Sequence, residues 1–239
     1  MPNDSAINFI LDDTACQIHT FGRLPVNAKV PFYLMPIWGD TTDLVEEQHK
    51  FLDPLFRKGV IQPFVLGIFE IKNWYDDLSP WPAPAMGRTQ SDFAGNGPAT
   101  LDWIQKRFIP AAEERLPLAL TGILGYSMGG MFALWVVYQT DIFRVCGCCS
   151  GSLWFDGFVD YLEHNEPKKP CAVYVSLGGR EERTHHSLYA QVGVCTRRTT
   201  AILKGCPMVQ NTAYVLHAGG HTDAIGTRLV AALKWMNRF

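Results

Sequence analysis

Residues 118–130 read LALTGILGYSMGG, and this stretch decides which fold we expect. Its apolar part predicts a strand over 118–124, and the segment that follows predicts a helix over 128–139. Between them lies a Gly-x-Ser-x-Gly pattern at 125–129, which is typical of a strained strand-to-helix turn that exposes a serine hydroxyl. We therefore predict that Ser127 is a nucleophile. The alternative is a glycine-rich turn with an ordinary solvent-exposed serine.

Short apolar runs alternate with amphipathic segments along the rest of the chain, which is the pattern of βαβ units. The strands are expected at 7–10, 16–21, 30–35, 63–71, 144–149, 172–177 and 213–217, and the helices at 43–57, 98–115, 187–203 and from the last strand to 237. The segment 73–98 is rich in proline, glycine and aromatic residues and predicts a long, functional loop. The expected fold is an α/β/α sandwich with a mostly parallel central sheet.

The composition excludes several classes of protein. The chain has 239 residues, 47% hydrophobic and 18% charged, which indicates one globular domain or at most two. Its formal net charge is −2 and its basic residues form no stripe, so we expect no nucleic-acid partner. The N-terminus lacks a signal-peptide pattern, and no apolar run approaches the roughly 20 residues of a membrane helix. We expect a cytoplasmic protein without a membrane partner.

Seven cysteines in a chain without an export signal favour reduced thiols over disulfides. Cys146, Cys148 and Cys149 lie close together, so we considered a metal cluster. On a strand the first two face one side and the third faces the other, and no Cys-x-x-Cys pair follows. We therefore predict buried thiols that act as small apolar residues, and no metal site.

The same turn predicts part of a site for negative charge. The amide of Met128 lies at the expected N-terminus of a helix, where unpaired N–H groups favour an oxyanion. A second donor is expected from the loop after the strand that ends near residue 35. Pro36 has no N–H, so the donor is Ile37 or Trp38, and Ile37 is our choice.

A serine nucleophile needs a base and an acid that orients the base. In folds with this turn, the histidine that serves as base follows the last strand. That leaves His217 and His221 as the candidates for the base. We choose His221, because it lies in a glycine-containing loop beyond the strand end. The acid is expected after the strand at 172–177, where Glu181 and Glu182 are the candidates. We choose Glu181 and keep Glu182 as the alternative.

Several motifs together resemble the Putative esterase family of the α/β-hydrolase superfamily, which includes feruloyl esterases, siderophore esterases and formylglutathione hydrolase. The motifs are 79–85 before the 92–95 loop, the turn at 125–130, 150–154, and 176–178 leading into 181–182. The chain looks most similar to small uncharacterised bacterial members. The resemblance implies a single α/β-hydrolase domain over 1–239, a three-layer sandwich. Family members often carry His-Gly where this chain has Pro36-Ile37, and often use Asp as the acid.

The residues and the resemblance together predict a serine esterase with a Ser127-His221-Glu181 triad, acting on a small-molecule ester without a metal or organic cofactor. Trp38, Trp81, Tyr126 and Trp154 come from loops near the nucleophile and are predicted to bind substrate, with structural packing as the alternative. Two other functions stay open. One is an acyltransferase on the same fold, and the other is a non-catalytic binding protein.

Overall fold

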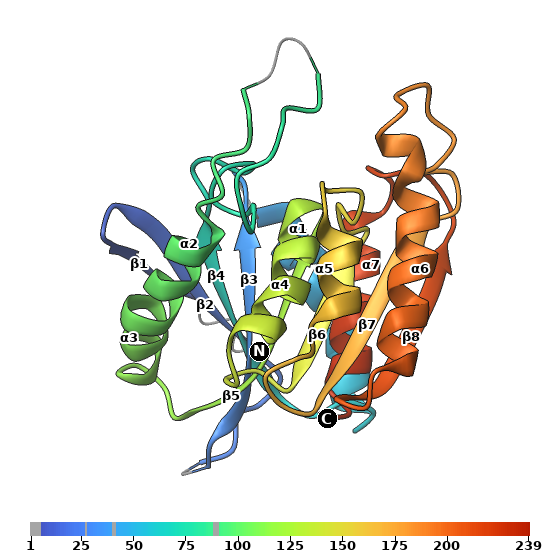
Figure 1. The fold of residues 1–239 in the computed structure, drawn as a ribbon. Coiled ribbons are helices and arrows are strands. Elements are labelled where there is room, and N and C mark those ends of the chain that lie inside the picture. Colours follow the sequence, from blue (N-terminus) through green and yellow to red (C-terminus); the bar gives the residue numbers. More distant parts are fainter. Residues whose placement is uncertain (1–5, 27, 40–41, 88–90) are drawn as a thin grey trace.

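An eight-stranded sheet forms the centre of the computed structural model, which describes residues 6–26, 28–39, 42–87 and 91–239 (Figure 1). The strand order is β1-β2-β4-β3-β5-β6-β7-β8. The strands are β1 (Ala6–Leu11), β2 (Thr14–Phe21), β3 (Val30–Ile37), β4 (Phe64–Glu70), β5 (Leu118–Tyr126), β6 (Val145–Cys149), β7 (Cys171–Gly178) and β8 (Val209–His217). β1 and β2 pair antiparallel, whereas β4, β3 and β5 to β8 pair parallel. This arrangement confirms the predicted mostly parallel sheet.

Helices cover both faces of this sheet. α1 (Thr42–Arg57) and α7 (Ile225–Met236) pack on one face, where their apolar residues share one buried cluster with β3 and β4. The other face is covered by α2 (Gly97–Trp103), α3 (Ile109–Glu113), α4 (Met128–Gln139), α5 (Phe158–His164) and α6 (Val192–Gly205). The three layers confirm the predicted sandwich, because each amphipathic helix buries its apolar side against the sheet.

Several predicted boundaries differ from the structure; the helix expected at 187–203, for example, begins at Val192. The helix expected at 98–115 is interrupted by a π-helical turn, Ile104–Phe108, between α2 and α3. Pro110 follows this turn and has no N–H to donate to the carbonyl of Lys106, so regular α-helical bonding cannot continue through it. The last strand begins at Val209 rather than at the predicted residue 213. The prediction began too late because Gln210 and Asn211 are polar residues exposed at the edge of the sheet, where the apolar pattern of a strand is missing.

The cysteine prediction is confirmed for the thiols on β6. Cys146, Cys148 and Cys149 are buried in the core and are not in disulfides. Burial raises the pKa of the Cys149 thiol to about 12. Within the part of the chain that the structure describes, no three His, Cys, Asp or Glu side chains group as metal ligands, and no helix has the length and apolar character to cross a membrane.

The parallel strands bring distant loops to one edge of the sheet. Tyr126 at the end of β5 pairs with Cys149, and Gly178 at the end of β7 pairs with His217 at the end of β8. The loops that follow β5, β7 and β8 therefore leave the sheet side by side, as expected at the carboxyl ends of parallel strands.

Candidate active site

Ser127 lies on a sharp turn between β5 and α4. Its φ of +57° is in the left-handed region, which is uncommon for a residue other than glycine. The turn requires glycine at position 125, because a Cβ there would lie 2.3 Å from the backbone of Gly129. The amide of Ser127 donates to the carbonyl of Cys149 (3.0 Å) and its carbonyl accepts from the amide of Ser152 (3.0 Å). These contacts fix the strained turn, so that the hydroxyl projects from the sheet edge.

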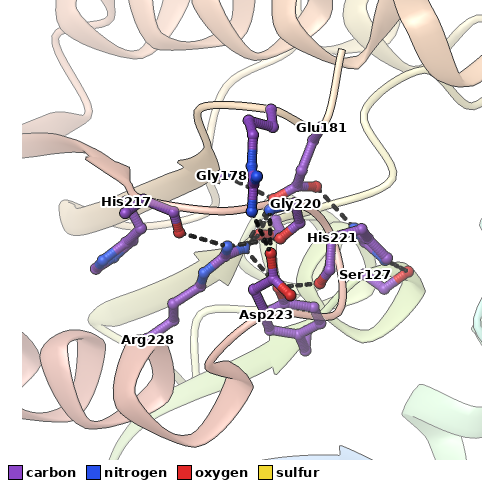
Figure 2. A network of polar contacts seen from close by, with 12 residues as sticks. Ser127, Gly178, Glu181, His217, Gly220, His221, Asp223 and Arg228 are labelled. Atoms are coloured by element: carbon purple, nitrogen blue, oxygen red, sulfur yellow. Dashed lines mark hydrogen bonds and ion pairs between the residues drawn. The ribbon is translucent and has the colours of Figure 1, made fainter. Parts of the chain in front are cut away.

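Three side chains from three loops form a hydrogen-bonded row (Figure 2). Nε2 of His221 lies 3.1 Å from Oγ of Ser127. On the other side of the ring, Nδ1 of His221 lies 2.7 Å from Oε2 of Glu181. With the proton on Nδ1, the imidazole donates to the carboxylate and Nε2 is free to accept the serine proton.

The carboxylate of Glu181 is buried, with only 2% of its side chain exposed. Burial by itself raises the pKa of this group, but hydrogen bonds outweigh it and hold the pKa below its ordinary value. The donors are His221, the hydroxyl of Ser150 (2.7 Å) and the amide of Gly178 (2.6 Å). Glu181 is therefore an anion that faces the histidine with one oxygen.

Sequence reasoning missed Arg228, which lies on α7 with 1% of its side chain exposed. Its Nη1 donates to Oε1 of Glu181 (2.8 Å), the oxygen that does not face His221. The signal was present, because Arg228 falls on the apolar face of α7, three residues after Ile225 and four before Ala232. A cation on the buried face of a predicted helix indicates a buried anionic partner.

Two serines in the loop after β6 were also missed as individual contributors. The hydroxyl of Ser150 donates to Glu181, and the hydroxyl of the buried Ser152 lies 3.3 Å from that of Ser127. Ser150 has a φ of +44°, so the loop turns sharply at the point where both side chains are placed. The sequence showed them only as part of a motif at 150–154.

The alternative acid and base lie elsewhere. Glu182 pairs with Arg197 on α6 at 3.1 Å, and both side chains are partly exposed. Nε2 of His217 lies 3.2 Å from the hydroxyl of Tyr174. Burial, followed by the charge of Arg228, lowers the pKa of His217. The row beside Ser127 is thus formed by the two residues chosen from the sequence, Glu181 and His221.

Comparison with known proteins identifies the family of this chain. A family model described as Putative esterase matches residues 22–211. The chain belongs to the Putative esterase family. The uncharacterized protein YbbA of Bacillus subtilis (strain 168) is similar to this chain. The two are 28% identical over 206 residues, which cover 82% of each chain.

Solved structures with the same fold carry names of serine hydrolases. The siderophore hydrolase EstB from Aspergillus nidulans matches with a TM-score of 0.76 and 16% identity, over 100% of this chain and 96% of that one. An IroE-like serine hydrolase from Shewanella oneidensis matches with a TM-score of 0.80 and 14% identity, over 98% and 80%. At this identity the two structures show that the family member shares their fold.

A cavity of about 270 Å³ opens beside Ser127 in this esterase-family chain. Its lining combines aromatic and polar side chains and consists of Tyr75, Ser127, Ser152, Trp154, Glu181, Thr184, Tyr189, Val192 and His221. The rings of Trp154 and Tyr189 meet edge to face at 5.2 Å and form one wall. The space next to the serine hydroxyl accommodates a small apolar or aromatic group.

Trp154 is the predicted aromatic residue that the structure brings to this cavity. Trp38 is 72% exposed on the surface. The indole N–H of Trp81 donates to the carbonyl of Asp156 (3.0 Å), and its ring packs among other aromatic rings. The hydroxyl of Tyr126 donates to the carbonyl of His221 (2.6 Å). These three side chains are thus not part of the cavity lining, although Tyr126 contacts His221, which is.

The two predicted oxyanion donors differ in how free their amides are. Met128 is the first residue of α4, so its amide has no acceptor within the helix. Ile37 is the last residue of β3 and pairs with Glu70, and its carbonyl accepts from the amide of Ile71 (2.8 Å). In this parallel register the amide of Ile37 points at the carbonyl of Phe69, which leaves Trp38 as the candidate for the second donor. The end of β3 lies near the turn. Cγ of Pro36 is so close to Gly129 that a Cβ placed on this glycine would lie 3.4 Å from it.

Proposed function

We propose that this protein is a serine hydrolase that cleaves carboxylic esters. One observation carries the proposal, namely the row in which Ser127 Oγ, the His221 ring and Glu181 Oε2 are joined at 3.1 Å and 2.7 Å. Nucleophile, base and orienting acid within hydrogen-bond reach are the requirement for nucleophilic catalysis by serine. Membership of the Putative esterase family supports the same reaction class.

The reaction follows from the positions of the three groups. Nε2 of His221 takes the proton of the Ser127 hydroxyl as Oγ attacks the ester carbonyl, and the resulting imidazolium gives the proton to the leaving alcohol. Glu181 stabilises the imidazolium and holds the ring by its Nδ1–H. Water then attacks the acyl-enzyme, with His221 as base once more, and the acid is released.

Charge on the carbonyl oxygen develops in the transition state and needs donors. The amide of Met128 supplies one, aided by the positive end of the α4 dipole. The amide of Trp38, the other candidate in the loop after β3, supplies the second, because the register of β3 and β4 points the amide of Ile37 at the carbonyl of Phe69. Each such donor contributes on the order of 10²–10³ in kcat in serine hydrolases.

The cavity indicates a compact ester with an apolar or aromatic part. Tyr75, Trp154 and Tyr189 offer ring faces and edges, and Thr184 and Ser152 offer hydroxyl groups. A volume of about 270 Å³ accommodates one such group beside the reacting carbonyl. We assign Trp154 to substrate binding, because it contributes directly to the wall of this cavity.

Labelling with a fluorophosphonate tests the proposal together with hydrolysis of p-nitrophenyl acetate. Wild type is expected to be labelled and to turn over the ester, and Ser127→Ala is expected to lose the label and lower kcat by on the order of 10⁵-fold or more. Ser91→Ala changes an exposed serine and is the matched control, with wild-type behaviour. A folded wild type that is neither labelled nor active, or a Ser127→Ala variant that keeps both, would contradict the proposal.

A further inference from the structure

The guanidinium of Arg228 contacts Glu181, the loop that carries His221, and Tyr126, the residue before Ser127. Its Nη1 lies 2.8 Å from Oε1 of Glu181, and its Nη2 donates to the carbonyl of Gly220 at 2.6 Å. We propose that Arg228 is a positioning residue that fixes the acid with one nitrogen and the histidine loop with the other. The inference rests on the proposed function for the role of that row.

The contacts of Arg228 with the histidine loop involve three backbone carbonyls, at positions 218, 220 and 221. Nη2 of Arg228 donates to the carbonyls of Ala218 (3.2 Å) and Gly220 (2.6 Å). The third carbonyl, that of His221, accepts from the hydroxyl of Tyr126, and this hydroxyl accepts from Nη1 of Arg228 at 2.7 Å. The carbonyls that determine where the His221 ring points are therefore tied directly or through one hydroxyl to the same cation.

The contacts with Glu181 determine which of its two carboxylate oxygens faces His221. Oε1 of Glu181 accepts from Arg228, from the hydroxyl of Ser150 and from the amide of Gly178. Ser150 itself accepts from Nη1 of Arg228 at 2.9 Å. With Oε1 occupied in this way, Oε2 is the oxygen that His221 meets.

Space around the guanidinium is shaped to admit it. A Cβ on Gly178 would lie 2.6 Å from Nη2 of Arg228, 2.7 Å from the carbonyl of Gly219 and 2.8 Å from Oε1 of Glu181. The glycine at the end of β7 is therefore required by the network. This is an observation independent of the hydrogen bonds, and it explains why the motif at 176–178 ends in glycine.

Lysine could not replace the two nitrogen contacts that the guanidinium of Arg228 makes. An ammonium has one nitrogen, whereas the guanidinium places two nitrogens in a plane, one toward Glu181 and one toward the loop carbonyls. Lysine would keep the positive charge and lose the simultaneous contacts. The substitution thus separates the charge of Arg228 from its geometry.

The charge of Arg228 acts on the titratable groups packed around it, which are Tyr126, Cys149, Tyr174, Glu181, His217 and Asp223. Glu181 is the one among them that contacts the ring of His221 through a carboxylate. In wild type the positive charge partly balances this carboxylate. Without Arg228, Oε1 of Glu181 and the carbonyls of Ala218 and Gly220 would lose a shared donor, and the contact between Glu181 and His221 would no longer be held from both sides.

The test follows the Nδ1–H proton of His221, which faces Oε2 of Glu181, by NMR in wild type, Arg228→Met and Arg228→Lys. We expect its low-field resonance to be lost or to move upfield in both Arg228 variants, because neither side chain holds Glu181 and the loop carbonyls at the same time. Arg197→Met removes a partly exposed cation from α6 and is the matched control, with an unchanged resonance. The measurement needs no turnover, so it remains decisive if wild type proves inactive and the proposed function fails.

The activity arm measures kcat for p-nitrophenyl acetate in the same four proteins. Both Arg228 variants are expected to lower kcat by about 10- to 1,000-fold, since small displacements of reacting groups cost about 10²-fold, and Arg197→Met keeps wild-type kcat. Near-ultraviolet circular dichroism identifies a variant that fails to fold, and Arg228→Lys, which retains the charge, then carries the test. An unchanged Nδ1–H resonance of His221 in folded Arg228→Met, or wild-type kcat in Arg228→Lys of an active enzyme, would overturn the proposal.

Discussion

Two candidate acids follow β7 and two candidate bases lie at the end of β8 and in the loop after it, and one residue of each pair joins the row that ends at Ser127. After β7, Glu181 has 2% of its side chain exposed and meets His221, whereas Glu182 is 39% exposed and pairs with Arg197. At β8, His221 reaches Ser127, whereas His217 meets Tyr174. Residue type is the same within each pair, so the surrounding donors and acceptors determine the difference in environment.

The largest effect is expected for the two histidines. His221→Ala removes the base beside Ser127 and should lower kcat for p-nitrophenyl acetate by on the order of 10⁴–10⁶-fold. His217→Ala removes a hydrogen bond to Tyr174 that contributes about 1 kcal/mol to stability, and kcat should stay close to that of wild type. Steady-state kinetics on both variants measures the contrast.

Equal losses in the two histidine variants would show that His217 also serves the reaction, and the comparison of the two positions would fail. The variants are compared only after their thermal unfolding midpoints have been recorded. This separates a loss of base from a loss of fold.

The two carboxylates are expected to give the next largest effect. Glu181→Gln keeps the shape of the side chain but loses the charge that stabilises the imidazolium, so kcat should fall by about 10²–10⁴-fold. Glu182→Gln breaks a partly exposed ion pair of the kind that contributes about 0–1 kcal/mol, and kcat should be unchanged. If Glu182→Gln were the impaired variant, the assignment of the acid would be reversed.

The sequence was sufficient for the sheet, its layers and the strand-turn-helix at Ser127, because these depend on local periodicity and on a glycine requirement within five residues. The contact between Gly125 and Gly129 is of this local kind. The chain order of serine, acid and histidine then reduced the candidates to two carboxylates and two histidines.

Contacts across long separations could not be predicted in the same way. Arg228 meets Glu181 across 47 positions and Ser150 across 78, and no periodicity links these residues. The aromatic residues show the same limit. Trp81 and Trp154 both come from loops near the site, but the packing of α5 and α6 turns one toward other rings and the other toward the cavity.

The smallest expected effect is on stability at acid pH. Hydrogen bonds hold the pKa of folded Glu181 below its ordinary value of 4.5, against the effect of burial. The unfolded chain therefore binds more protons at this position as the pH falls below about 4.5, and the free energy of unfolding decreases. The contribution is fully present above that pH and is lost as the pH falls through the pKa of the folded state.

Urea unfolding between pH 3 and pH 7 measures this contribution as the difference between wild type and Glu181→Gln. The difference should be constant at the upper end of the range and should shrink below about pH 4.5. Glu182→Gln should follow wild type throughout, since its partly exposed carboxylate exchanges one solvated environment for another on unfolding. A difference that grew toward low pH would mean that folded Glu181 binds its proton more readily than the unfolded chain does. Burial would then outweigh the donors, and the contrast between the two neighbouring carboxylates would be one of exposure alone.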